Sequence, residues 1–188
     1  MVKVIVLDLR NIIVLTACVL GILLFAIPSF ADGPMVGDMA PDFSSLSTSG
    51  RFFELSEIEG KPILLSFWSD WCSSERLELS FLKKMYERYP DVVIAIVDSE
   101  SGVPSIRSLT RIAGSLAEWG IGAKILVDID LEVTGLYNVT SLPTSLLIDP
   151  SGKVVYRQPN FFNSDVDEVS ASLDRAALVS LLLDRRVE

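Results

Sequence analysis

The chain has 188 residues, of which 49% are hydrophobic, and it carries a formal net charge of -9. This length fits one globular domain preceded by a targeting segment, and the acidic balance excludes a general nucleic-acid binder. The chain contains no histidine, which excludes a Cys–His or Ser–His–Asp nucleophile system and histidine ligation of a metal or haem. We therefore expect no nucleic-acid partner, no cofactor and no metal site.

Residues 1–31 have the features of a targeting segment. Lys3 and Arg10 supply positive charge, residues 11–30 are almost wholly apolar, and Ser29-Phe30-Ala31 resembles a cleavage site. The apolar stretch is also close to the ~20 residues that span a bilayer, so an uncleaved anchor is the alternative to a cleaved signal. Either case predicts an extracytoplasmic domain, in a bacterial periplasm or on the outer face of the inner membrane.

Only two cysteines occur, Cys18 and Cys72. Leu15-Thr16-Ala17-Cys18 fits a lipoprotein cleavage box, but apolar sequence continues for about ten residues beyond it, which disfavours lipidation. Cys18 belongs to the targeting segment, so the exported domain holds one thiol. A single cysteine is unusual in an oxidising compartment, where cysteines usually pair.

After a linker at residues 32–36, residues 37–186 read as one α/β domain. Its first half predicts a hairpin of 43–46 and 51–55, a helical turn at 56–60, a strand at 62–68, a helix at 75–89 and a strand at 92–97. Both strands are continuous apolar runs around a helix, which indicates a parallel βαβ unit. Leu82, Met85, Tyr86 and Tyr89 recur at helical spacing and are expected to form the core face of that helix.

The second half predicts a helix at 105–119, a strand at 123–127, a short helix at 131–137, a strand pair of 144–148 and 153–157, and a closing helix at 166–185. Asp149-Pro150-Ser151-Gly152 forms the turn between the paired strands. Asp128 and Asp130 are interpreted as ordinary polar residues at a strand end. A calcium loop would need more oxygen ligands.

Cys72 is the candidate nucleophile because it lies where the first buried strand passes into a helix. Unpaired N–H groups and the helix dipole at such a junction favour the thiolate. Glu75, one helical turn later, opposes this by placing a carboxylate near the sulfur; it is alternatively an ordinary acid of the first helical turn. A buried thiol without chemistry remains the alternative for Cys72.

Residues 60–78 read Gly-Lys-Pro-Ile-Leu-Leu-Ser-Phe-Trp-Ser-Asp-Trp-Cys-Ser-Ser-Glu-Arg-Leu-Glu. This run resembles the TlpA/ResA-like branch of the thioredoxin superfamily, which is related to the AhpC/TSA redoxins. The resemblance implies a thioredoxin-like α/β fold, a central mixed sheet flanked by helices, and thiol–disulfide exchange. Glu75 stands where the resembling proteins keep their second, resolving cysteine, so a mixed disulfide at Cys72 has no internal thiol to release it.

The resemblance also assigns roles around the thiol. Trp71 precedes Cys72, as in the resembling proteins, and Glu78 matches a glutamate associated with proton handling near their thiols. The alternative for Glu78 is a solvated helix face. Pro143 matches their cis-proline, and the backbone of Leu142 would pair with an extended substrate chain.

Three functions follow from these observations. The first is a monothiol thiol–disulfide oxidoreductase or isomerase acting on exported proteins with thiols or disulfides; a membrane reductant or glutathione are further candidate partners. The second is a binding module that holds a peptide without turnover. The third is a peroxiredoxin-like peroxidase, which is disfavoured because the motif proline would fall at Leu65 and the late arginine is replaced by the Leu142-Pro143 region.

Overall fold

The computed structural model describes residues 33–58, 60–69, 75–100, 105–160 and 167–175. The predicted targeting segment and much of the predicted closing helix lie outside these residues. Within them, no helix has the length and apolar character to cross a membrane.

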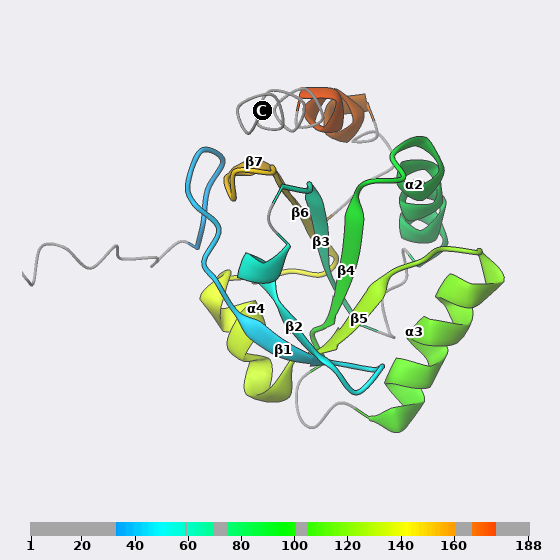
Figure 1. The fold of residues 1–188 in the computed structure, drawn as a ribbon. Helices are drawn as coiled ribbons and strands as arrows, with labels where there is room; N and C mark the ends of the chain where they lie inside the picture. The colour runs from blue at the N-terminus through cyan, green and yellow to red at the C-terminus, as the bar shows by residue number, and fades with distance from the viewer. Residues whose placement is uncertain (1–32, 59, 70–74, 101–104, 161–166, 176–188) are drawn as a thin grey trace, which may run out of the picture. The chain divides into compact units, whose positions relative to one another are not determined.

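A seven-stranded mixed sheet in the order β2-β1-β5-β4-β3-β6-β7 forms the centre of the domain (Figure 1). The strands are β1 (Ser44–Ser47), β2 (Phe52–Glu54), β3 (Ile63–Trp68), β4 (Val93–Asp98), β5 (Lys124–Val127), β6 (Thr144–Ile148) and β7 (Val154–Pro159). The helices are α2 (Glu75–Arg88), α3 (Ile106–Glu118) and α4 (Glu132–Leu136), with 3-10 turns η1 (Leu55–Glu57) and η2 (Ile129–Leu131). Residues 167–175 are also helical.

The predicted βαβ unit is confirmed, because β3 and β4 pair in parallel with α2 between them in the chain. β6 runs antiparallel to β3 and to β7. All six residues of β3 are buried, and so are all five of β6. Strands buried on both faces are continuous apolar runs, which is why these two could be recognised in the sequence.

Side chains of β3 alternate between two apolar clusters, one on each face of the sheet. Leu64 and Trp68 lie in the cluster that also holds buried residues of α2, α3 and the helical residues 167–175. Leu65 and Phe67 lie in the other cluster, which includes residues of α4, η1 and the β1–β2 hairpin. This alternation decides which side chains of β3 can reach α2.

The core face of α2 differs from the prediction at one residue. Leu82 and Met85 are buried as expected, at 0% and 1% exposure, but Tyr86 is 38% exposed. Leu79 and Phe81 belong to the buried face instead. The buried face extends further toward the N-terminus of the helix than the predicted stripe, and Glu78, four residues before Leu82, lies on it.

Two polar segments are packed more closely than the sequence suggests. Asp128 is 1% exposed, and its two carboxylate oxygens accept hydrogen bonds from Val133 N and Thr134 N, each at 2.8 Å. It therefore caps α4, because the first N–H groups of a helix need outside acceptors.

Gly33, within the predicted linker, is buried; its φ is +69°, and a Cβ there would lie 2.4 Å from Tyr137 O.

Candidate active site

The candidate site is built on β3 and α2, whose ends flank the predicted thiol. β3 ends at Trp68, Ser69 follows, and α2 begins at Glu75. Cys72 and Trp71 lie outside the described residues, and so does the side chain of Glu75. The geometry of the site is therefore given by the described residues on either side of them.

Glu78 is the one predicted site residue of α2 whose side chain the structure describes, and it is completely buried, at 0% exposure. The alternative of a solvated helix face is wrong. Glu78 Oε1 accepts a hydrogen bond of 2.5 Å from the Ser66 hydroxyl on β3. Glu78 Oε2 has no partner among the described residues.

Burial raises the pKa of Glu78 from 4.5 to about 7, and the hydrogen bond from Ser66 lowers the pKa and so opposes part of this effect. Burial acts in this direction because a carboxylate loses its hydration in an apolar surrounding. An acid with a pKa near neutrality exchanges protons readily at the pH where a cell works. Strongly shifted acids gather at functional sites, which agrees with the role that the sequence predicts.

Ser66 is also linked to β6. Ser66 and Ser145 stand directly opposite each other in the antiparallel pairing of β3 and β6. The Ser145 hydroxyl donates to Ser66 Oγ at 3.3 Å, and both serines are 0% exposed. A line of hydrogen bonds thus runs from β6 through β3 to the buried acid of α2.

The Leu142–Pro143 peptide bond is cis, as predicted, and β6 begins at the next residue. Leu142 is half-buried and contacts both apolar clusters. Its main-chain N–H and C=O make no hydrogen bond within the described part of the chain. These groups can therefore pair with another extended chain.

Two further buried polar atoms lie at the end of β3. Trp68 Nε1 and Ser69 Oγ, like Glu78 Oε2, have no hydrogen-bond partner among the described residues. Buried polar atoms are normally hydrogen-bonded. Within the described residues, the end of β3 and the first turn of α2 thus leave three buried polar atoms without a partner.

The sequence did not single out Ser66 and Ser145. The available signal was their polarity within the otherwise apolar strands β3 and β6. Ser66 has the same alternation phase as Leu64 and Trp68, which face α2. Among the described residues, no group of three or more His, Cys, Asp or Glu side chains could hold a metal ion.

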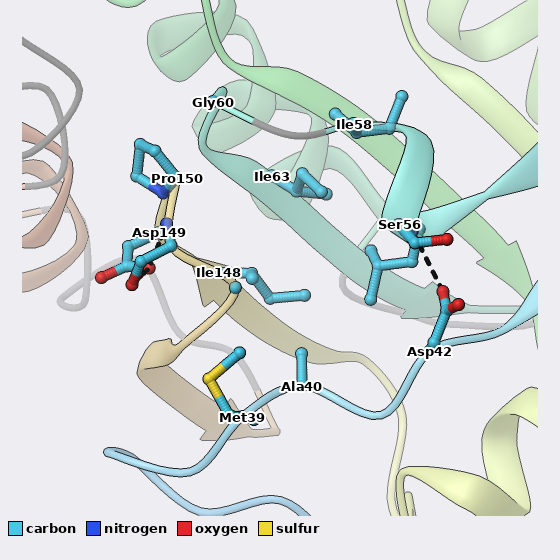
Figure 2. Close-up of a pocket in the computed structure, with 13 residues that line it drawn as sticks. Met39, Ala40, Asp42, Ser56, Ile58, Gly60, Ile63, Ile148, Asp149 and Pro150 are labelled. Atoms are coloured by element: carbon cyan, nitrogen blue, oxygen red, sulfur yellow. Dashed lines mark hydrogen bonds between the residues drawn. The ribbon is translucent and has the colours of Figure 1, made fainter. Parts of the chain in front are cut away.

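A pocket of about 430 Å³ lies elsewhere, and Figure 2 shows its lining. Apolar side chains such as Leu55, Ile63 and Ile148 form its walls, and Asp42 accepts a 3.0 Å hydrogen bond from Ser56 N at its margin. Ile63 begins β3, whereas the predicted thiol follows its other end, about 16 Å away at ~3.3 Å per residue. No predicted site residue lines this pocket.

Comparison with known proteins agrees with this architecture. The family model described as "AhpC/TSA family" matches residues 36–157. Thiol-disulfide oxidoreductase ResA of Bacillus subtilis is 30% identical over 146 residues, covering 77% of this chain and 79% of the relative.

Solved structures show the same fold. A putative thiol:disulfide interchange protein DsbE from Chlorobium tepidum superposes with a TM-score of 0.65 and 25% identity, over 77% of this chain and 99% of that one. A putative protein disulfide isomerase from Bacteroides thetaiotaomicron gives a TM-score of 0.65 at 22% identity, over 76% and 90%. The chain therefore belongs to the AhpC/TSA family, as a thioredoxin-fold member similar to ResA.

Proposed function

We propose that this protein is a monothiol thiol–disulfide oxidoreductase or isomerase that acts through Cys72. The observation that carries the proposal is the burial of Glu78, the fourth residue of the helix that follows the thiol in the sequence, which raises its pKa to about 7. The membership of the family and the similarity to proteins named as thiol–disulfide oxidoreductases support the same chemistry.

The reaction begins with loss of the Cys72 thiol proton to Glu78. The thiolate then attacks one sulfur of a partner disulfide, so that a Cys72–partner S–S bond forms and the partner's own S–S bond breaks. The second partner sulfur leaves as a thiolate and takes up the proton. One disulfide replaces another, and no external oxidant is needed.

Release of the mixed disulfide needs a second thiol, because Glu75 stands in place of a resolving cysteine. The partner can supply this thiol itself, in which case a partner disulfide is isomerised. A second copy of the chain or a small thiol such as glutathione can instead attack Cys72 Sγ, so that the partner leaves reduced and Cys72 is left in a disulfide with that thiol, which a further thiol then reduces. The main chain of Leu142 would hold the extended partner beside the thiol by strand addition.

The proposal is tested by trapping mixed disulfides in cells that express the full chain. Rapid acidification protonates thiols and stops exchange, after which adducts are separated without reductant and identified by mass spectrometry. Because the chain has two cysteines, Cys18→Ser and Cys72→Ser form a matched pair. Adducts are expected to persist in Cys18→Ser and to vanish in Cys72→Ser. Adducts that survive in Cys72→Ser, or none in either variant, would exclude exchange at Cys72.

The competing function is a binding module that uses the fold without turnover. It predicts that Cys72→Ser leaves the phenotype of the producing strain unchanged, whereas exchange predicts the phenotype of a deletion. The thiolate absorbance of Cys72 separates the two as well: a thiol pKa below about 7 supports exchange and one above about 9 supports a module.

We also propose that the domain works outside the cytoplasm. The positive and apolar parts of residues 1–31 support export. Protease added to spheroplasts should digest the domain without lysis, while a cytoplasmic marker stays intact. Protection of the domain until lysis would refute export.

A further inference from the structure

A pair of buried serines links β6 to the candidate acid. Ser145 Oγ donates to Ser66 Oγ at 3.3 Å, and Ser66 Oγ donates to Glu78 Oε1 at 2.5 Å. All three side chains are 0% exposed. The three residues come from three different elements, β6, β3 and α2, and meet inside the domain.

The direction of these hydrogen bonds restricts the carboxyl group. A serine hydroxyl has one proton to donate. Ser66 gives its proton to Glu78 Oε1, and it receives the proton of Ser145. With Ser66 donating, Oε1 is an acceptor, and this arrangement puts the exchangeable proton of neutral Glu78 on Oε2. Oε2 is also the oxygen with no partner among the described residues.

Burying the hydroxyl groups of Ser66 and Ser145 costs free energy that apolar packing does not recover. Leu64, Trp68 and Leu147 surround this face of β3 and β6 with apolar atoms. A buried hydroxyl loses hydrogen bonds to water, so a valine at either position would suit the strands better. Two hydroxyls placed opposite each other and next to a buried acid indicate a role directed at that acid.

We propose that Ser66 and Ser145 are positioning residues that hold the Glu78 carboxyl group with Oε1 as acceptor and Oε2 as the proton-carrying atom. The use of this proton by Cys72 rests on the function proposed above. The positioning itself involves only described residues and stands apart from disulfide exchange.

The other titratable groups on this face of the sheet come from several elements. Among the described residues, the buried titratable side chains on this face also include Tyr156 of β7 and Asp98 of β4, which accepts a hydrogen bond from the Ser108 hydroxyl of α3, and Tyr89 lies at the margin of the apolar cluster. Around Tyr89, the charged groups are Arg88, whose guanidinium carbon lies 5.4 Å from the ring centroid, and Asp174, which accepts a 2.8 Å hydrogen bond. The pKa of Glu78 is raised by burial and lowered in part by the hydrogen bond from Ser66.

The test follows the Glu78 carboxyl carbon by NMR during a pH titration of the full chain labelled with ¹³C at glutamate. Ser66→Ala should raise the midpoint by about one pH unit, because a hydrogen bond to a charged group favours the ionised form. Ser145→Ala should raise it less, because it removes only the polarisation of Ser66. Ser66→Thr keeps the hydroxyl and should restore the midpoint.

A matched control is Ser45→Ala, which removes a buried serine of β1 that donates to Val127 O. It should leave the Glu78 midpoint unchanged. A midpoint that also stays unchanged in Ser66→Ala and Ser145→Ala would overturn the proposal and leave the serines a purely structural role.

Infrared spectra at low pH provide a second readout that also works with a partly destabilised variant. In neutral Glu78 the carbonyl oxygen is Oε1, which accepts from Ser66, so its stretching band should move to higher frequency in Ser66→Ala. An unmoved band would contradict the assigned proton position. Neither readout involves Cys72. If the midpoint and the band shift as expected but Cys72 forms no adducts, the proposed function is refuted and the positioning role of the two serines is supported.

Discussion

Glu78 reaches from α2 to Ser66 on β3, and its Oε1 lies 2.5 Å from the serine hydroxyl in a fully buried setting. Within the described residues, the hydrogen-bonding partner of this acid is a neutral hydroxyl. The protein thus holds an ionisable group in an apolar core, six residues after its candidate thiol in the sequence. Several measurable consequences arise from this one contact.

Stability should fall as pH rises through the titration of Glu78. Its pKa is about 7 in the folded chain, against 4.5 for an ordinary glutamate in water, which represents the unfolded chain. Below 4.5 both states are protonated, between the two values only the unfolded chain ionises, and above 7 both are ionised. The buried charge then costs about 3.5 kcal/mol, the product of the shift in pKa and ~1.4 kcal/mol per unit.

Glu78→Gln should remove this cost, because glutamine has nearly the shape of the protonated acid. Urea unfolding is expected to show nearly equal stability of variant and native chain near pH 4.5 and a more stable variant at pH 8, by about 3.5 kcal/mol. Glu87→Gln is the control, since Glu87 is 62% exposed on the same helix. Parallel stability–pH curves for the native chain and Glu78→Gln would contradict the burial of an ionising Glu78.

The position of the core face of α2 is tested by two adjacent residues. Met85 is 1% exposed and Tyr86 is 38% exposed. Met85→Ala should destabilise the domain by about 2–5 kcal/mol, whereas Tyr86→Ala should cost less than about 1 kcal/mol. Chemical denaturation measures both. A larger loss of stability in Tyr86→Ala than in Met85→Ala would show that Tyr86 belongs to the core face, as the sequence predicts.

Asp128 should be important for α4. Its Oδ2 accepts from Thr134 N at 2.8 Å and from the Thr134 hydroxyl at 2.5 Å. Asp128→Asn replaces one acceptor oxygen by a donor and should cost about 1–3 kcal/mol, because a buried N–H or O–H loses its partner. Asp130→Asn, at an exposed neighbour, should be nearly neutral. Equal effects in thermal unfolding would argue against the cap.

Arg157 should hold the described residues 34–38 against the domain by hydrogen bonds. Its guanidinium donates to Tyr137 O at 3.0 Å, to Asn138 O at 3.2 Å and to Pro34 O at 3.3 Å, and burial lowers its pKa. Arg157→Met should keep the aliphatic contacts and lose these bonds, at a cost of about 1–3 kcal/mol. Hydrogen exchange should rise at residues 35–38, and not in the exposed control Arg51→Met. Unchanged exchange would show that the segment is held by other contacts.

Much of the fold could be predicted because its signals are local. Residues 63–68 and 93–98 are apolar runs around a helix, and this pattern alone indicates a parallel pair. The cis Leu142–Pro143 bond was predicted from a family motif and is confirmed. These features depend on neighbouring residues, which a single sequence displays.

The interior of the site depends on distant residues and could not be predicted in the same way. Ser66 and Ser145 are 79 positions apart, and only the register of β3 against β6 places them opposite each other. The burial of Glu78 likewise depends on which face of α2 packs against the sheet. Helical spacing from Leu82 puts Glu78 on that face as well, but its charge indicated a solvated position.

The central claim, that Cys72 exchanges disulfides, is tested most directly by the intact mass of the purified full chain carrying Cys18→Ser after incubation with oxidised glutathione. The account predicts a mass increase of one glutathionyl group, reversed by reduced glutathione, and no increase in Cys72→Ser. A chain that keeps its unmodified mass while unfolded protein is modified under the same conditions would contradict it.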